Sequence, residues 1–341
     1  MSANSIAPTL RARAACRVDL AGGTLDIWPL YLLHPGAVTV NLAVTVPVEC
    51  RIAPHKSRAI ELISRDTGIR ERFASLDALL AAKKHKHPLA AQMAGWFAPS
   101  GGFRMETYSA SPAGAGISGS SALMIASAAA LACYTGRTFS PEQLRVIAQN
   151  VEARLIGVPT GCQDYYPALY GGVGAIHLEV EGIRHEPLAV DLEEMNQRFV
   201  LAYTGKPHNS GINNWEVFQR RIAGDKKVIR NFEQIGAIAR QMREALLAAD
   251  WTATAALLRQ EWRQRRTNAP GISTAFIDEL IALSRKHGGV AAKVCGAGGG
   301  GCVIFQCQPG RRAELETALA AAGAEILPFA VEDSGVSVEE L

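Results

Sequence analysis

The sequence has 341 residues, of which 48% are hydrophobic and 20% are charged, and its formal net charge is +3. This composition is typical of a soluble globular protein, and the length favours two domains over one. The small net charge gives no reason to expect a nucleic-acid partner, the N-terminus lacks the apolar region of a signal peptide, and the longest apolar run, 122–134, is too short and too rich in alanine to span a membrane.

Strands and helices alternate in the first half of the chain. Valine-rich segments with partial alternation predict strands, and apolar residues at helical spacing predict helices. The segment 139–157 has the clearest start, because Ser140 is a natural N-cap, Pro141 suits the first helical position and Gln143 completes a capping box. We expect strands at 15–23, 37–53, 101–110 and 171–180, and helices at 75–97 (interrupted at Pro88), 121–136 and 139–157.

The second half begins after the polar connection 185–197, which is the best candidate for a domain boundary. No repeat and no long low-complexity linker is present. We therefore expect an α+β protein of two domains, 1–190 and 191–341. The expected elements are a strand at 197–205, a mainly helical stretch at 214–285, two strands around a glycine turn at 290–308, a helix at 311–323 and a strand at 324–332.

A loop rich in glycine and serine runs directly into an apolar helix at 109–132. Backbone N–H groups at a helix start are unpaired and carry partial positive charge, and glycines let a backbone approach an anion closely. The stretch therefore predicts a phosphate-binding loop, and a plain turn with a serine N-cap is the alternative. Neither a Walker A loop nor a Rossmann fingerprint fits it. The residues of this loop are Pro112, Gly114, Ala115, Gly116, Ser118, Gly119, Ser120 and Ser121.

Two further stretches favour a ligand-binding protein. Near the N-terminus, CRVDLAGGTLDIWPLY places Arg17 and Asp19 before a double glycine and Asp26 after it, which is one way to present a carboxylate to sugar hydroxyls. In the second half, KVCGAGGGGCVIF has five glycines in six positions between two apolar strands. Such a run weakens any packing role, so close approach of the backbone to a ligand or to another chain is the natural reason for it.

In this order, the three stretches resemble the motifs of the GHMP kinases, the family of galactokinase, homoserine kinase, mevalonate kinase and phosphomevalonate kinase. The central family pattern is roughly P-x-G-x-G-L-G/S-S-S-A, and this chain has PAGAGISGSSA at 112–122, with Gly119 where serine is more common. The resemblance covers nearly the whole chain. It implies a two-domain α+β fold, the first domain like ribosomal protein S5 domain 2 and the second ferredoxin-like. ATP would lie over the central loop, and the glycine run from Gly296 to Gly301, with Gly298 and Gly299 as its substrate-binding residues, would lie against the nucleotide and the substrate.

The resemblance also implies catalytic residues. Asp164 in VPTGCQDYYPALYGG occupies the position of the family's proposed base, where it would accept the proton of the attacking hydroxyl or hold that hydroxyl in line with the γ-phosphate. Arg17 matches an arginine that keeps this carboxylate ionised and stabilises charge on the transferred group. Glu152 matches a Mg²⁺ carboxylate of some members, and Ser120 and Ser121 offer hydroxyls to the metal. The alternatives are a turn residue for Asp164 and a solvated helix residue for Glu152.

The first motif narrows the substrate. DLAGGTLDIWPLY resembles the corresponding stretch of bacterial heptose 7-phosphate kinases and of the kinase part of L-fucokinase, which implies phosphorylation of a sugar or sugar phosphate, at the anomeric hydroxyl. Departures at Trp28, Tyr165 and Pro167, all expected at the sugar pocket, leave the sugar open. Lys206 and His208 are expected to bind a substrate phosphate unless they form an ordinary polar loop. The predicted acceptor-binding residues are Asp19, Gly23, Thr24, Asp26, Lys206, His208, Gly298 and Gly299.

Other interpretations stay open at this stage. The same fold serves kinases and decarboxylases of the mevalonate branch, against which the sugar-type first motif argues. It also serves non-catalytic sensors of ATP and sugar, against which the intact Arg17, Asp164 and serine loop argue. The expected partners are a small-molecule sugar, ATP and Mg²⁺, with no nucleic acid and no membrane, and the oligomeric state is open between monomer and homodimer. Seven cysteines without a CxxC pair favour buried reduced thiols in a cytoplasmic protein.

Two charged stretches are predicted to be ordinary surface. KKHKHP at 83–88 contains His-Lys-His but no nearby cysteine or carboxylate cluster, so a solvated helix end is favoured over a metal site. RQEWRQRR at 259–266 is predicted to be a charged helix face.

Overall fold

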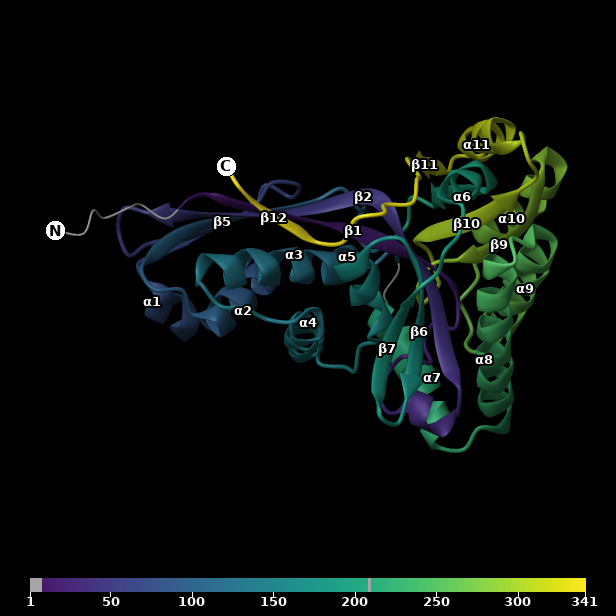
Figure 1. The fold of residues 1–341 in the computed structure, drawn as a ribbon, viewed down its shortest axis with the longest axis horizontal. Coiled ribbons are helices and arrows are strands. Elements are labelled where there is room, and N and C mark those ends of the chain that lie inside the picture. Colours follow the sequence, from purple (N-terminus) through teal and green to yellow (C-terminus); the bar gives the residue numbers. More distant parts are fainter. Residues whose placement is uncertain (1–7, 208–209) are drawn as a thin grey trace.

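The computed structural model of the chain describes residues 8–207 and 210–341. Its strands form one sheet of eight strands and one of four (Figure 1). The larger sheet contains β1 (Leu10–Ala21), β2 (Ala37–His55), β3 (Ile60–Ser64), β4 (Arg70–Phe73), β5 (Gly102–Ser109), β6 (Val173–Glu179), β7 (Gly182–Pro187) and β12 (Ser337–Glu340). The smaller sheet contains β8 (Phe199–Tyr203), β9 (Gly289–Val294), β10 (Cys302–Cys307) and β11 (Glu325–Leu327).

The helices divide between the two sheets. Figure 1 shows α1 to α4 below the larger sheet, and α8 to α11 around the smaller one. The α-helices are α1 (Leu76–Ala81), α2 (Pro88–Phe97), α3 (Gly119–Tyr134), α4 (Pro141–Ile156), α5 (Tyr166–Tyr170), α6 (Leu192–Arg198), α7 (Ser210–Ile222), α8 (Lys226–Leu247), α9 (Trp251–Arg265), α10 (Ala275–Ser284) and α11 (Arg312–Ala321). Short 3-10 helices are η1 (Leu30–Leu33), η2 (Gln163–Tyr165) and η3 (Arg285–His287).

The 19-residue strand β2 organises the larger sheet. Its first half pairs with β6, its second half pairs with β5, and β1 runs antiparallel along both halves. The pairing of β3 with β5 is parallel. β1 pairs with β2 as far as Ala21. The loop after β1 therefore begins where the larger sheet contacts the second domain, and its Gly23 carbonyl accepts a hydrogen bond from Arg265.

The smaller sheet has the strand order β11-β8-β10-β9, and each of its pairings is antiparallel. Along the chain, β8 is followed by helices, then β9 and β10, then α11 and β11. This β-α-β-β-α-β arrangement is ferredoxin-like. The predicted α+β class and the ferredoxin-like second domain are confirmed.

One predicted helix start is confirmed, and another lies two residues earlier than predicted. Ser140 accepts a hydrogen bond from the Gln143 backbone, and the Gln143 side chain accepts one from the Ser140 backbone, which completes the capping box. The serine-rich loop leads into α3 at Gly119. Residues 121–132 of α3 are all buried, and their high alanine content lets this central helix pack closely beneath the larger sheet (Figure 1).

The chain returns to the larger sheet at its end. β12 pairs antiparallel with β1, so that Leu10 lies opposite Glu340 and Arg13 lies opposite Ser337. The segment 191–341 thus forms the smaller sheet and also adds a strand to the larger one. No helix among residues 8–207 and 210–341 is long and apolar enough to cross a membrane.

Candidate active site

A cavity of about 510 Å³ is lined by residues of both domains. The serine-rich loop before α3 lies between its two ends. One end is lined by residues that follow β1 and α4, by Gln163 and Asp164 of η2 and by parts of the second domain. We call it the acceptor end, because it holds the predicted acceptor-binding residues. The other end is lined by the β3–β4 turn, the start of α2 and β5. A cavity of this size is within the range of small-molecule sites.

The backbone of the serine-rich loop is shaped so that a ligand can approach it closely. Gly114 and Gly116 have φ angles of 64° and 76°, and Ser118 also has a positive φ, 57°. Ser118 is the N-cap of α3, yet its side chain makes no capping hydrogen bond. A Cβ on Gly119 would lie 2.8 Å from the Ser111 Cβ. Glycine at this position therefore avoids a clash with the Ser111 side chain.

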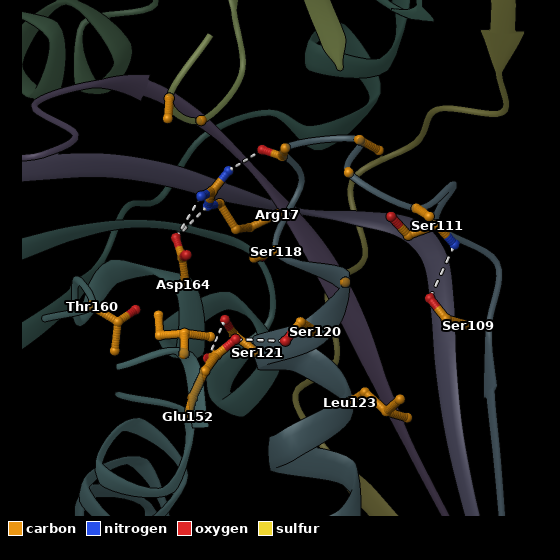
Figure 2. A pocket seen from close by; sticks show the side chains of 18 of the residues that line it. Arg17, Ser109, Ser111, Ser118, Ser120, Ser121, Leu123, Glu152, Thr160 and Asp164 are labelled. Atoms are coloured by element: carbon orange, nitrogen blue, oxygen red, sulfur yellow. Dashed lines mark hydrogen bonds and ion pairs between the residues drawn. The ribbon is translucent and has the colours of Figure 1, made fainter. Parts of the chain in front are cut away.

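The serines of α3 converge on one buried carboxylate (Figure 2). Ser120 Oγ donates to Glu152 Oε1 at 2.5 Å, and Ser121 Oγ donates to Oε2 at 2.8 Å. Tyr165, expected at the sugar pocket, instead donates to Glu152 Oε2 at 2.5 Å. Burial raises the pKa of Glu152, and the hydrogen bonds from these hydroxyls partly oppose that rise.

Arg17 and Asp164 form an ion pair beside this group (Figure 2). The Arg17 Nε and Nη2 atoms lie 2.9 and 2.5 Å from Asp164 Oδ1, while Nη1 donates to the Gly116 carbonyl at 2.7 Å. The Arg17 side chain is 4% exposed and that of Asp164 is 24% exposed. One buried guanidinium therefore connects the serine-rich loop to a carboxylate that remains accessible from the cavity.

Asp19 is already occupied by protein groups. Lys293 Nζ donates to its carboxylate at 2.6 Å and to its backbone carbonyl at 2.8 Å, and the Gly296 N–H donates to Oδ1 at 3.3 Å. Arg17 and Arg265 lie 3.8 Å from the same carboxylate. Burial alone would raise the pKa of Asp19, but the three cations outweigh it and lower the pKa to about 2.

Asp26 has fewer partners. Its Oδ2 accepts the Gln163 backbone N–H at 2.9 Å, and the side chain is almost fully buried at the cavity wall. Burial raises the pKa of Asp26 to about 7, and the negative charge of Asp164 adds to the effect. A Cβ on Gly161 would lie only 2.0 Å from Asp26 Oδ2, so glycine is required there for the carboxylate to fit.

At the other end of the cavity, the prediction of a solvated helix end at 83–88 is wrong for His87. His87, predicted to lie at a solvated helix end, is buried and bonds Thr107 Oγ1 through Nε2 at 2.7 Å. Its backbone N–H donates to Glu71 Oε2 at 2.8 Å, directly before Pro88 starts α2. These two contacts hold the segment before α2 against β4 and β5. Burial lowers the pKa of His87.

Comparison with known proteins identifies the family. The family profile "GHMP kinases N terminal domain" matches residues 79–172, and "GHMP kinases C terminal" matches residues 242–325. The chain belongs to the GHMP kinase family. These matches confirm the resemblance found in the sequence, together with the two-domain fold it implied.

Three relatives of this GHMP kinase are informative. The D-glycero-alpha-D-manno-heptose 7-phosphate kinase of Campylobacter jejuni is 25% identical, and the alignment covers 96% of this chain and 98% of the relative. The mevalonate kinase of Thermococcus onnurineus is 27% identical, but only 67% of each chain is covered. The crystal structure of a D-glycero-D-manno-heptose 1-phosphate kinase from Bacteroides thetaiotaomicron has a TM-score of 0.80 at 22% identity and covers 97% of this chain and 99% of its own.

The structure brings most of the predicted GHMP kinase residues together. The cavity is lined by Arg17, Asp19, Thr24, Asp26, Pro112, Gly114, Ala115, Gly116, Ser118, Gly119, Ser120, Ser121, Glu152 and Asp164. Gly23 lies directly behind this wall, where a Cβ would meet Asp19, Gln163 and Arg265 side chains within 3.0 Å.

Several predicted residues lie elsewhere. Gly298 and Gly299 pack against Ile272, and it is Gly296 and Ala297 of the glycine run that line the cavity. Lys206 is exposed and contributes no side chain to the lining among the described residues. His208 lies outside the described residues. Trp28 is 64% exposed and, like Pro167, lies away from this lining.

Sequence reasoning did not single out several polar residues of the cavity lining, among them Gln163, Asn214 and Arg265. The segment 259–266 had been predicted to be a charged helix face. That prediction is wrong for Glu261 and Arg265, whose side chains are 0% and 5% exposed. Their spacing of four residues places them on one face of α9, but only the fold shows that this face is buried.

Proposed function

We propose that this GHMP kinase transfers the γ-phosphoryl group of ATP to a hydroxyl group of a sugar or sugar phosphate. The observation that carries the proposal is the Arg17–Asp164 ion pair, which lies between the serine-rich loop and the acceptor end of the cavity. Phosphoryl transfer depends mainly on positioning and on electrostatic stabilisation. A fixed guanidinium beside an accessible carboxylate supplies both.

Each group has a specific task in this proposal. The backbone N–H groups at the start of α3 bind the phosphates, as helix N-termini do. Arg17, held by the Gly116 carbonyl, stabilises negative charge on the transferred group. Asp164 accepts the proton of the attacking hydroxyl or orients that hydroxyl. Asp26 accepts a hydrogen bond from another hydroxyl of the acceptor, which fixes the sugar in the cavity.

The residues around Glu152 fit a magnesium ion. One carboxylate and two serine hydroxyls are hard oxygen donors, and proteins commonly bind Mg²⁺ through one or two carboxylates together with substrate phosphates. No group of three or more His, Cys, Asp or Glu residues able to hold a metal occurs in the described part of the chain. Ser120, Ser121 and Glu152 would therefore hold the ion jointly with ATP. Bound there, the ion would neutralise negative charge on the phosphates of ATP.

The relatives guide the choice of acceptor. The alignment with the heptose 7-phosphate kinase extends over nearly all of both chains, whereas the mevalonate kinase alignment covers two thirds. We therefore infer a sugar or sugar phosphate, phosphorylated at the anomeric hydroxyl. That hydroxyl is more acidic than an ordinary alcohol, which suits a carboxylate base paired with an arginine. A cytoplasmic location and a possible homodimer remain part of the proposal.

A substrate panel tests this function. Purified protein is incubated with ATP, Mg²⁺ and, in separate reactions, D-glycero-D-manno-heptose 7-phosphate, L-fucose, D-mannose, D-galactose or mevalonate. ADP release is measured, and products are identified by mass spectrometry. We expect turnover with one of the sugars and a new anomeric phosphate. Turnover with mevalonate alone would assign the protein to the mevalonate branch, and binding of ATP and sugar without ADP release would indicate a sensor.

The mechanism predicts a large effect of Asp164→Asn. The substitution keeps the side-chain shape and removes the charge, so kcat should fall by about 10²- to 10⁴-fold, the usual range for a positioned proton acceptor, while ATP affinity changes little. The measurement is single-turnover phosphoryl transfer, with Asp278→Asn, an exposed residue of α10, as the control. Activity within about tenfold of wild type would mean that Asp164 only orients the hydroxyl, because an amide oxygen still accepts a hydrogen bond.

A further inference from the structure

Four buried charged residues link the two domains at the acceptor end of the cavity. This interdomain charge cluster consists of Asp19 on β1, Glu261 and Arg265 on α9, and Lys293 on β9. None of the four side chains is more than 5% exposed. Burying so many charges is costly unless each is paired, so the arrangement demands an explanation beyond packing.

Arg265 connects this cluster to the acceptor loop, which we define as residues 22–27. Its Nη2 donates to the Gly23 carbonyl at 3.1 Å, and its Nη1 donates to Thr24 Oγ1 at 3.3 Å. On its other side, its Nε donates to Glu261 Oε1 at 2.8 Å. The planar guanidinium thus bridges a helix of the second domain and the loop that carries Asp26.

The two halves of the acceptor loop are held differently. Leu25 and Ile27 are buried in the core, and Ile27 forms a β-bridge with Gly161. Gly22–Thr24 has no such core contacts: it is held by turn hydrogen bonds from Leu25 N to Gly22 O and from Ile27 N to Thr24 O, both 3.3 Å. Besides Arg265, Asn214 of the second domain also contacts it, because Thr24 Oγ1 donates to Asn214 Oδ1 at 3.2 Å. Thr24 also has a φ of 76°, which is unfavourable for a β-branched residue and persists only where surrounding contacts impose it.

We propose that Arg265 is a positioning residue that fixes the first half of the acceptor loop from the second domain, so that acceptor binding depends on the contact between the domains. Glu261 and Asp19 hold the guanidinium in place, and Lys293 holds Asp19. Arginine is required because its rigid fork bonds Gly23, Thr24 and Glu261 at once, whereas a lysine offers a single ammonium. The kinetic consequence rests on the proposed sugar kinase function, but the structural one does not.

The first experiment measures loop order without any substrate. Hydrogen–deuterium exchange is followed for a peptide covering residues 22–27 in the wild type, in Arg265→Lys and in the control Arg266→Lys. Arg265→Lys keeps the positive charge beside Glu261, so the fold should survive. Arg266 is the adjacent residue, but it is exposed and pairs with Asp278. We expect faster exchange in this peptide for Arg265→Lys only, and unchanged exchange for Arg266→Lys.

The second experiment measures the kinetic consequence with the sugar that the substrate panel identifies. Hydrogen bonds from a charged group contribute enough that their loss should raise the acceptor KM by about 10- to 100-fold in Arg265→Lys. The KM for ATP should be unchanged, since ATP binding does not involve the acceptor loop. A purely structural weakening would instead affect both substrates together.

The outcomes separate the two proposals. If no sugar is phosphorylated but exchange at 22–27 rises in Arg265→Lys, the proposed function fails and the positioning role stands. If sugars are phosphorylated and Arg265→Lys has wild-type exchange and wild-type acceptor KM, the positioning role is overturned. Arg265→Met adds a harsher test, and should it fail to fold, the lysine variant alone decides.

Discussion

Asp19 and Asp26 lie on either side of the same double glycine, and both were predicted to bind the acceptor. Their surroundings are opposite. Asp19 receives Lys293, the Gly296 N–H and two arginines, and its pKa is lowered to about 2. Asp26 receives one backbone N–H at its carboxylate, and burial raises its pKa to about 7. One carboxylate is saturated by protein, and the other has hydrogen-bonding capacity to spare.

The difference shows that two carboxylates of one sequence motif can have different roles. Asp19 ties β1 to the second domain, so we propose that its function is structural and that it does not bind sugar. Asp26 lies on the cavity wall with an incompletely paired carboxylate, which is the property that a hydroxyl-binding residue needs. Three substitutions can break or sharpen this comparison.

The largest expected effect is that of Asp19→Asn on stability. The substitution leaves Lys293 buried without a full counter-charge, and breaking a buried ion pair in this way costs about 3–5 kcal/mol. We expect the free energy of unfolding, measured by urea denaturation at neutral pH, to fall by this amount. The control is Asp278→Asn, which removes an exposed ion pair and should cost at most about 1 kcal/mol. Equal effects of the two variants would contradict the structural role of Asp19.

Asp26→Asn should affect binding more than folding. The acceptor KM should rise by about 10- to 100-fold, because an amide is a weaker acceptor than a carboxylate and adds a donor, while the KM for ATP stays the same. Initial-rate kinetics at saturating ATP measure this effect. A raised KM for ATP with an unchanged acceptor KM would show that Asp26 contacts ATP and not the acceptor.

The same variant should also alter the pH dependence of stability. The pKa of Asp26 is raised to about 7 in the folded protein, whereas an unfolded aspartate titrates near about 3.9. Its contribution to stability is therefore complete below the unfolded pKa and is lost as the pH rises through the folded pKa. Relative to the wild type, Asp26→Asn should become progressively more stable between about pH 4 and about pH 7. A constant difference between the two proteins across this range would contradict the raised pKa.

Gly161→Ala should have the smallest effect of the three and should act only through Asp26. The added methyl group would overlap Asp26 Oδ2, since its carbon would lie 2.0 Å away. Overpacking of this kind costs about 1–3 kcal/mol, and displacement of Asp26 should raise the acceptor KM. The matched control is Gly236→Ala in α8, where the nearest atom would be Leu25 Cδ1 at 3.6 Å. An unchanged acceptor KM in Gly161→Ala would show that the position of Asp26 is unimportant.

Local features of the sequence predicted local structure well. The capping box at Ser140 and the start of α3 after the serine-rich loop follow from residues within one helical turn, so neither needs the rest of the fold. The family resemblance also predicted that Arg17 lies beside Asp164, although the two residues are far apart in the sequence.

Long-range burial could not be predicted in the same way. Glu261 and Arg265 stand in a stretch of charges that reads as a surface, and only the packing of α9 against β9 and the acceptor loop shows that they are buried. Lys293 did offer a signal, because a lone lysine inside an apolar strand next to a glycine run needs a buried partner. His87 likewise became buried through Glu71 and Thr107, neither of which is a neighbour in sequence.

The pairing of β12 with β1 also affects how the protein is made. Domains generally fold in order as they leave the ribosome, the N-terminal one first. Here the larger sheet, which carries Arg17, Asp19 and the acceptor loop, gains its edge strand only when residues 337–340 have been synthesised. Until then, the outer edge of β1 at Leu10–Arg13 stays unpaired on the nascent chain, and unpaired edges invite aggregation. Completion of the first domain therefore waits for translation of the second.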